Sequence, residues 1–139
     1  MKTILVAVDG SPRAPGVIAF AADYAKSSGA GIVLLRVVTA LGDIPSGALP
    51  ISPAQILDVL LQRAQHELDE LARTVPPEVP TKTRVETGTA WHTICDAGKS
   101  ADAALIVIGS HGYTALDRML GTTAARVVNH ADRPVLVVR

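Results

Sequence analysis

Apolar runs of strand length recur along the chain and alternate with segments of helical periodicity. The runs are rich in Val, Ile and Leu, and all except the third are nearly continuous in apolar residues. Continuous apolar runs are typical of strands that are covered on both faces, as in parallel sheets. The predicted strands lie at residues 3–8, 31–38, 83–88, 104–109 and 134–139.

Segments between these runs have the length and periodicity of helices. The longest, residues 52–77, has Ser52 as a helix cap, Pro53 as the first helical residue and one apolar stripe, and should end before Pro76. Another helix should end at Gly29, because glycine often follows the last helical residue. Strands that alternate with helices favour an open parallel sheet with helices on both faces. The shorter helices are predicted within residues 16–30, 90–101 and 122–131.

Composition narrows the class of protein. The chain has 139 residues, which predicts one domain over residues 1–139, and its formal net charge is zero without a basic block, which argues against a nucleic-acid partner. Cys95 is the only cysteine, so an internal disulfide is excluded and an intracellular setting is favoured. No apolar run approaches the roughly 18 residues of a membrane-spanning helix. These features predict a soluble, cytoplasmic protein.

The stretch IGSHGYTALDRMLGTT, residues 108–123, follows the fourth apolar run. In open parallel sheets ligands bind beyond the carboxyl ends of the strands. Gly109 and Gly112 leave backbone N–H groups accessible, and Gly121, Thr122 and Thr123 open the last helix, where free amides and hydroxyls favour an anion. The stretch therefore indicates a phosphate site, although turn glycines and Thr122 as a helix cap explain the residues alone equally well.

Asp9 and His111 are the other candidate binding residues. Asp9 follows the first run, and its carboxylate suits ribose hydroxyls or an exocyclic amine. The alternative is that Asp9 caps a turn, although Ser11 and Pro12 already supply a cap and a first helical residue. His111 could donate to a phosphate or could be exposed. No two of the four histidines have the spacing of a helical metal pair, so no histidine metal site is predicted.

Several enzyme signatures are missing. The sequence has no Walker-type loop and no dinucleotide fingerprint after the first run, and Ser110 within Gly-Ser-His-Gly does not form a nucleophile elbow. The acids near the predicted site are Asp9 and Asp117, which do not make the carboxylate pair that would hold a metal for fast phosphoryl transfer. We therefore assign no catalytic residue from the sequence.

The stretches ILVAVDGSP, VLLRVV, LIVIGSHG and GTTAARVVNHADRPVLVV, in this order, resemble the universal stress protein family over essentially the whole chain. The nucleotide-binding branch of that family has two glycines separated by two residues, and then a third glycine followed by Ser or Thr. Here these are Gly109, Gly112, Gly121 and Thr122. The spacer at residues 113–120 is one residue shorter than is usual in the family.

The resemblance implies an α/β fold with an open, five-stranded parallel sheet of order 3-2-1-4-5, flavodoxin-like or adenine nucleotide alpha hydrolase-like. It also implies an ATP-binding regulatory protein of the stress response that uses ATP with Mg²⁺ and hydrolyses it slowly at most. A homodimer through residues 134–139 would cover the apolar edge of the last strand, and helices that cover this edge are the alternative. The resemblance also implies a role for each candidate residue. Asp9 would contact the adenosine, and the backbone near Val37 would contact the adenine. The ribose and phosphates would be bound by Gly109 and Gly112, the outer phosphates by Gly121, Thr122 and Thr123, and the pocket would be lined by Ala7, Ile108 and His111.

Two other functions stay open on the sequence. One is an enzyme that acts at a nucleotide phosphate, with His111 or Asp9 as its acid or base. The other is an interaction module whose glycine stretch binds nothing. The retained glycines and Thr122 argue against this module, because a loop without a ligand has little need for them.

Overall fold

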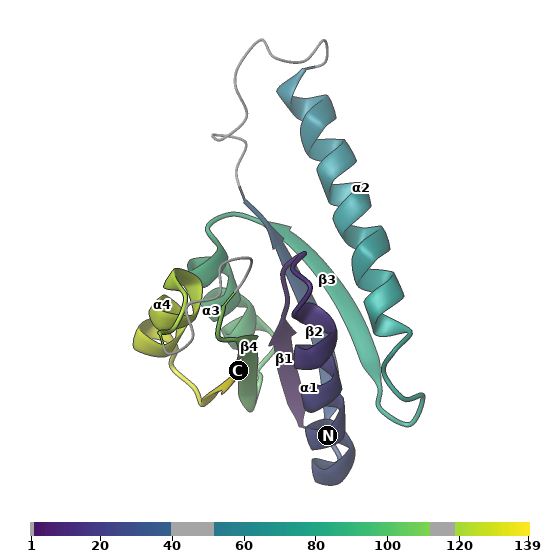
Figure 1. The fold of residues 1–139 in the computed structure, drawn as a ribbon, viewed down its shortest axis with the longest axis vertical. Helices are drawn as coiled ribbons and strands as arrows, with labels where there is room; N and C mark the ends of the chain where they lie inside the picture. Colours follow the sequence, from purple (N-terminus) through teal and green to yellow (C-terminus); the bar gives the residue numbers. More distant parts are fainter. Residues whose placement is uncertain (1, 40–51, 112–118) are drawn as a thin grey trace.

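The strands form one parallel sheet in the order β3-β2-β1-β4-β5, which confirms the fold and strand order expected from the sequence. The computed structural model describes residues 2–39, 52–111 and 119–139 (Figure 1). In this part of the chain no helix combines the length and apolarity needed to cross a membrane. The elements are β1 (Thr3–Ala7), α1 (Ala14–Ser28), β2 (Gly31–Val38), α2 (Pro53–Ala72), β3 (Thr81–Thr87), α3 (Ala90–Ser100), β4 (Leu105–Gly109), α4 (Thr122–His130) and β5 (Val135–Val138).

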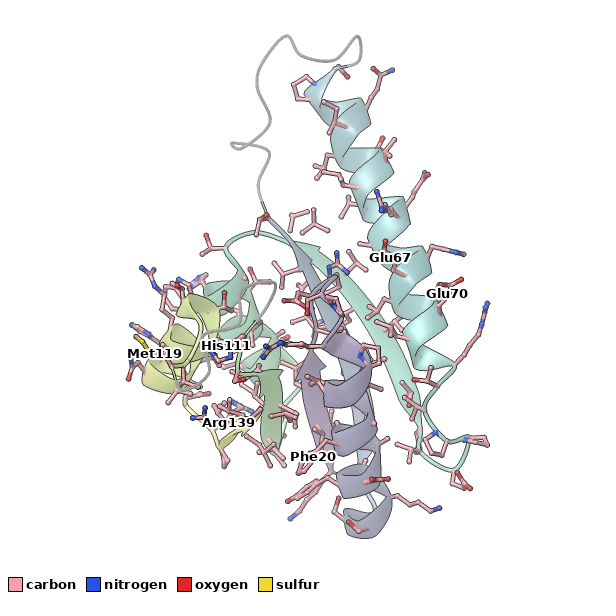
Figure 2. All side chains as sticks on the ribbon, viewed as in Figure 1. Phe20, Glu67, Glu70, His111, Met119 and Arg139 are labelled. Carbon is pink, nitrogen blue, oxygen red and sulfur yellow. The ribbon has the colours of Figure 1, made fainter. Side chains whose placement is uncertain are left out.

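Helices cover both faces of the sheet: α1 and α2 pack on one face, and α3 and α4 on the other (Figure 1). Successive residues of a strand point to opposite faces. Ile4 and Val6 of β1 therefore join the core under α1 and α2, whereas Leu5 and Ala7 join the core under α3 and α4. Because β1 is covered on both faces, it has an apolar residue at every position after Thr3. On α2, Glu70 projects from the outer side of the helix, whereas Glu67 forms an ion pair with Arg36 of β2 (Figure 2).

Helix α1 ends as predicted and begins at Ala14, after the start that Ser11 and Pro12 suggest and two residues before the predicted range of 16–30. Gly29 follows it in the left-handed conformation, with φ of 73°. The first helical residue is Ala14 and the N-cap is Arg13, so the assignment of Ser11 as cap and Pro12 as first residue is wrong. Ser11 instead belongs to a turn, in which its hydroxyl oxygen accepts a hydrogen bond from the backbone N–H of Arg13 at 3.3 Å. A proline within the first helical turn is tolerated, because no intrahelical partner is needed there.

Helix α2 begins at the predicted cap and ends before the predicted proline. Ser52 and Gln55 form a reciprocal capping box, in which the Ser52 oxygen accepts from the backbone of Gln55 at 3.3 Å and the Gln55 side chain accepts from the backbone of Ser52 at 2.9 Å. The helix stops at Ala72 instead of continuing toward Pro76. The backbone N–H of Val75 bonds to the carbonyl of Ala72 at 3.1 Å, and this turn buries the Val75 side chain. The helix thus ends before Pro76, as predicted, and the buried Val75 lies in the turn between them.

The strand order reverses between β1 and β4. The chain leaves β1 through α1 on one face to reach β2, and it enters β4 from α3 on the other face. The two strands pair in parallel, with Ala7 beside Ile108 at their carboxyl ends. Connections that leave in opposite directions open a crevice at this point, which is where such sheets bind ligands.

Candidate functional site

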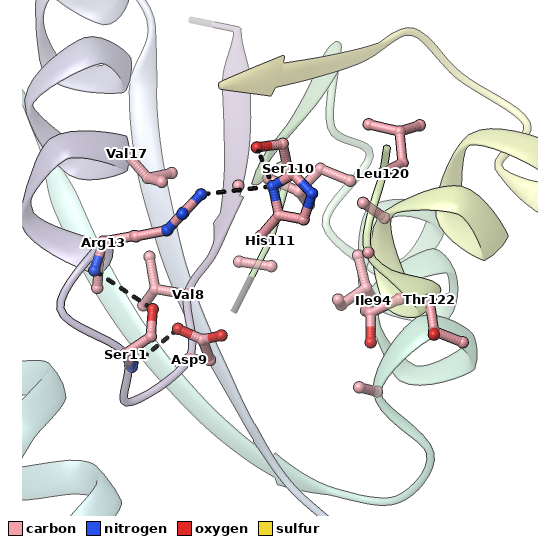
Figure 3. A pocket seen from close by; sticks show the side chains of 18 of the residues that line it. Val8, Asp9, Ser11, Arg13, Val17, Ile94, Ser110, His111, Leu120 and Thr122 are labelled. Carbon is pink, nitrogen blue, oxygen red and sulfur yellow. Dashed lines mark hydrogen bonds between the residues drawn. The ribbon is translucent and has the colours of Figure 1, made fainter. Parts of the chain in front are cut away.

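A cavity of about 490 Å³ lies at the carboxyl ends of β1 and β4 (Figure 3). Its size falls within the range of roughly 300–1,000 Å³ that is usual for small-molecule sites. The turn before α1, the start of α4 and the inner face of α3 complete its wall. Gly112 lies outside the described residues. Every other residue proposed from the sequence lines the cavity: Ala7, Asp9, Val37, Ile108, Gly109, His111, Gly121, Thr122 and Thr123.

One part of the wall is apolar. Ala7, Leu35, Ile94, Ile108 and Ala124 line the cavity and also belong to the core beneath α3 and α4. Their positions are therefore fixed by packing, and a ligand would meet a preformed surface. A flat aromatic group such as a nucleobase suits a wall of this kind, because its burial removes apolar area from water.

The two described glycines of the phosphate motif sit where the chain packs closely on itself. A Cβ on Gly121 would lie 3.2 Å from the Ser110 carbonyl oxygen, and a Cβ on Gly109 would lie 3.3 Å from Val17 Cγ2. The backbone N–H of Gly121 also donates to the Ser110 carbonyl at 2.7 Å. Gly121 thus joins the start of α4 to the end of β4, Gly109 lies against α1, and this close packing favours glycine at both positions independently of any ligand.

The start of α4 leaves backbone donors uncapped by any side chain. Gly121 is the N-cap residue, so the alternative that Thr122 caps the helix is wrong. Thr122 and Thr123 are the first helical residues, are exposed and line the cavity. The first amides of a helix have no intrahelical acceptor, and the helix dipole adds partial positive charge there. This edge of the cavity therefore offers amides and hydroxyls to an anion.

Asp9 has a local role and also faces the cavity. Its Oδ1 atom accepts a hydrogen bond from the backbone N–H of Ser11 at 2.9 Å, so the carboxylate does hold the turn, as the alternative interpretation proposed. The side chain is exposed and lines the cavity, where its second oxygen can accept from a hydroxyl. Within the described ranges, Asp9 is the carboxylate that lines this cavity, and no group of three His, Cys, Asp or Glu side chains could hold a metal ion.

His111 lies between two donors. Its Nδ1 atom is 3.1 Å from Ser110 Oγ and 3.4 Å from Arg13 Nη1 (Figure 3). Since the guanidinium can only donate, Nδ1 is the acceptor, and the neutral imidazole carries its proton on Nε2. That Nε2 atom is buried and has no hydrogen-bond partner among the described residues. Ser110 is only 2% exposed, which does not suit an attacking nucleophile.

Sequence reasoning missed Arg13 and Ile94, which both line the cavity. Ser11 and Pro12 resemble a helix start in sequence, which draws attention away from Arg13, whereas Arg13 is itself the N-cap and its side chain turns toward His111. The available signal was its position in the first turn after β1, at the edge where ligands bind. The inward orientation of Ile94 depends on how α3 packs, which local spacing does not define.

Comparisons with known proteins give one consistent result. A model of the universal stress protein family matches residues 1–139. Universal stress protein A homolog 1 of Coxiella burnetii is 31% identical over 140 residues, which cover 99% of this chain and 95% of that protein. The solved universal stress protein UspA from Lactobacillus plantarum is 30% identical with a TM-score of 0.81, covering 99% of this chain and 97% of that one. A universal stress protein from Archaeoglobus fulgidus, solved in complex with dAMP, shares the fold at 22% identity and a TM-score of 0.70, covering 100% and 98% of the two chains.

Proposed function

This chain belongs to the universal stress protein family, and we propose that it is an ATP-binding regulatory protein of the stress response. The observation that carries the proposal is the cavity at the ends of β1 and β4, which joins an apolar wall to the uncapped start of α4. The dAMP in the Archaeoglobus fulgidus structure supports an adenine nucleotide as the class of ligand.

The wall suggests how the nucleotide would lie. The adenine would pack on the apolar residues near Leu35 and Val37, and Asp9 would accept from a ribose hydroxyl. The phosphates would then face the first turn of α4 at Thr122 and Thr123, where amides and hydroxyls are available. A Cβ at Gly121 would crowd the chain beside this turn, so a glycine at this position is compatible with a close approach of the phosphates to the backbone.

Mg²⁺ would reach the site bound to the phosphates of ATP, whose charge it neutralises. Asp9, the carboxylate on the described wall, already uses one oxygen in its own turn. Fast phosphoryl transfer requires a held metal and a positioned nucleophile. The described wall supplies one carboxylate and not the pair that would hold a metal, so we expect hydrolysis to be slow at most.

We also propose a homodimer through residues 134–139. Strand β5 pairs with β4 along one edge, and all four of its residues are half-buried. Pairing with a second copy would cover this apolar edge, which otherwise invites aggregation. A Val137→Lys variant should shift the mass measured by light scattering from dimer to monomer. A Val59→Lys variant adds the same charge at a position that is 57% exposed on α2, and thermal unfolding must show that Val137→Lys is folded, because Val137 also packs against the core beneath α3 and α4. A wild-type protein that is already monomeric would refute the dimer.

The nucleotide proposal is tested on the freshly purified protein. Mass spectrometry of the material released on denaturation should find ATP or ADP, and calorimetry on the stripped protein should show binding of ATP in the presence of Mg²⁺. Absence of a released nucleotide, together with no binding of ATP or adenosine, would instead support the interaction module. Turnover of ATP at ordinary enzyme rates would contradict the regulatory role and favour the enzyme.

A further inference from the structure

Arg13 is held at the edge of the cavity by the turn that precedes α1. Its backbone N–H donates to the Ser11 hydroxyl, and its carbonyl accepts from Gly16 at 3.1 Å and from Val17 at 3.2 Å. The backbone of Arg13 is therefore fixed, and its side chain extends across the cavity toward His111 (Figure 3). This position at the N-cap also means that the side chain has no role inside the helix.

The guanidinium of Arg13 uses only part of its hydrogen-bonding capacity among the described residues. It is half-buried, and one of its nitrogens lies 3.4 Å from Nδ1 of His111, which is a neutral acceptor. Among the ion pairs formed by the described residues none involves Arg13, although Asp9 lines the same cavity. A guanidinium keeps its charge at physiological pH and offers five N–H donors. The cavity thus contains a positioned cation whose fork has no carboxylate partner among the described residues and can bind an anion.

This cation lies on the β4 side of the cavity, away from the lining residues of β2. Leu35 and Val37, on which the adenine would pack, belong to β2, whereas His111, which Arg13 contacts, follows β4. In the sheet, β1 separates β2 from β4. His111 also adjoins the start of α4, because a Cβ on Gly121 would lie 3.5 Å from His111 Cα. Arg13 borders a second hollow as well, which continues toward Val138 and Arg139 of the C-terminal end.

We propose that Arg13 makes the cavity select adenine nucleotides by the number of their phosphates, with its guanidinium binding the phosphates beyond the first. A nucleotide with its base on β2 and its phosphates along the first turn of α4 would bring the phosphates beyond the first to the end where Arg13 also lies, so that Arg13 and this turn would share them. AMP and adenosine would not reach the guanidinium, and ATP and ADP would. This inference rests on the proposed nucleotide function and adds the residue that distinguishes among the nucleotides.

Calorimetry with ATP, ADP, AMP and adenosine, on the wild type and on Arg13→Gln, tests this selection. We expect the wild type to bind ATP at least tenfold more tightly than AMP, since a hydrogen bond to a charged group corresponds to roughly a ten- to hundredfold change in affinity. Arg13→Gln should lose most of this preference, with ATP weakened about tenfold or more and adenosine changed less than about threefold. Arg13→Lys should restore part of the preference, because it keeps the charge without the planar fork.

The control is Arg73→Gln, which removes the same charge at the exposed C-terminal end of α2. This variant should bind all four ligands as the wild type does, and thermal unfolding should show that each variant is folded. Equal losses for ATP and adenosine in Arg13→Gln would mean that Arg13 only organises the cavity and would overturn the inference, as would unchanged ATP binding. A wild type that binds none of the four ligands would refute the nucleotide function itself. Binding of all four with similar affinity would refute the selection alone.

Discussion

Replacement of Gly121 by valine should weaken ATP binding while the fold is retained. Gly121 has φ of −63° and ψ of 163°, an ordinary extended conformation, so the cost arises from contacts and not from the backbone. The new Cβ would lie 3.2 Å from the Ser110 carbonyl oxygen, which also accepts the 2.7 Å hydrogen bond from Gly121. The two methyl groups add further crowding, so the start of α4 must move away from the end of β4.

The size of the effect follows from these contacts. Overpacking of this kind costs about 1–3 kcal/mol of unfolding free energy, which most domains survive. Displacement of the first turn of α4 would misalign the amides that face the phosphates. Loss of one charge-assisted hydrogen bond, about 1.5–3 kcal/mol, raises the dissociation constant of ATP roughly 10- to 100-fold.

Calorimetry of ATP binding measures this change, and urea denaturation measures the stability of the same samples. Gly16→Val is the matched control, because a Cβ on Gly16 meets no atom within 4 Å. Adenosine should bind to the Gly121 variant nearly as well as to the wild type, since it lacks phosphates. A folded Gly121→Val protein with the ATP affinity of the wild type would refute the assignment of this turn to phosphate.

Three further predictions concern stability. Gly98→Ala should cost about 1–3 kcal/mol in urea denaturation, because its Cβ would lie 2.9 Å from Cδ1 of Ile106; an unchanged midpoint would show that Ile106 can move aside. Ser52→Ala should cost about 0.5–2 kcal/mol in the same assay through loss of the capping box, and Ser52→Asp should retain most of the stability. Burial of the Cys95 thiol raises its pKa above the ordinary value of 9.0, and the negative charge of the Asp96 carboxylate raises this pKa further. The unfolded chain therefore releases this proton at a lower pH, so stability should fall as the pH rises past about 9 and fall less in Cys95→Ala; equal losses at pH 10 would contradict this.

The fold was predictable because the burial of each strand is visible in its sequence. β1 and β4 are central strands, so nearly every residue is apolar, and their continuous runs stand out. β3 is an edge strand and carries polar residues such as Lys82 and Arg84, which explains its weak pattern. Its start at Thr81, two residues before the prediction, depends on pairing with Ile32, and a partner strand is not part of a local pattern.

The candidate site was predictable in its position and less so in its chemistry. Asp9 and Gly109 directly follow strands, and the rule for parallel sheets places such residues at one edge. Arg13 was not identified, because its orientation depends on the turn in which Ser11 bonds to Asp9. Ser and Pro in sequence favour a helix start through local propensity, and the hydrogen bonds of the turn override that preference here.

The same reversal of strand order explains both the two cores and the cavity between them. Side chains from α1, such as Val17, belong to the core on one face, and Ile94 of α3 and Ala124 of α4 belong to the core on the other. These three residues line one cavity, because helices of both layers border the carboxyl ends of β1 and β4. A bound nucleotide would therefore contact both layers at once, with its base against one core and its outer phosphates beside the turn that begins α1. Binding energy would then depend on the relative position of the two layers, which is the physical basis on which a nucleotide could regulate this protein.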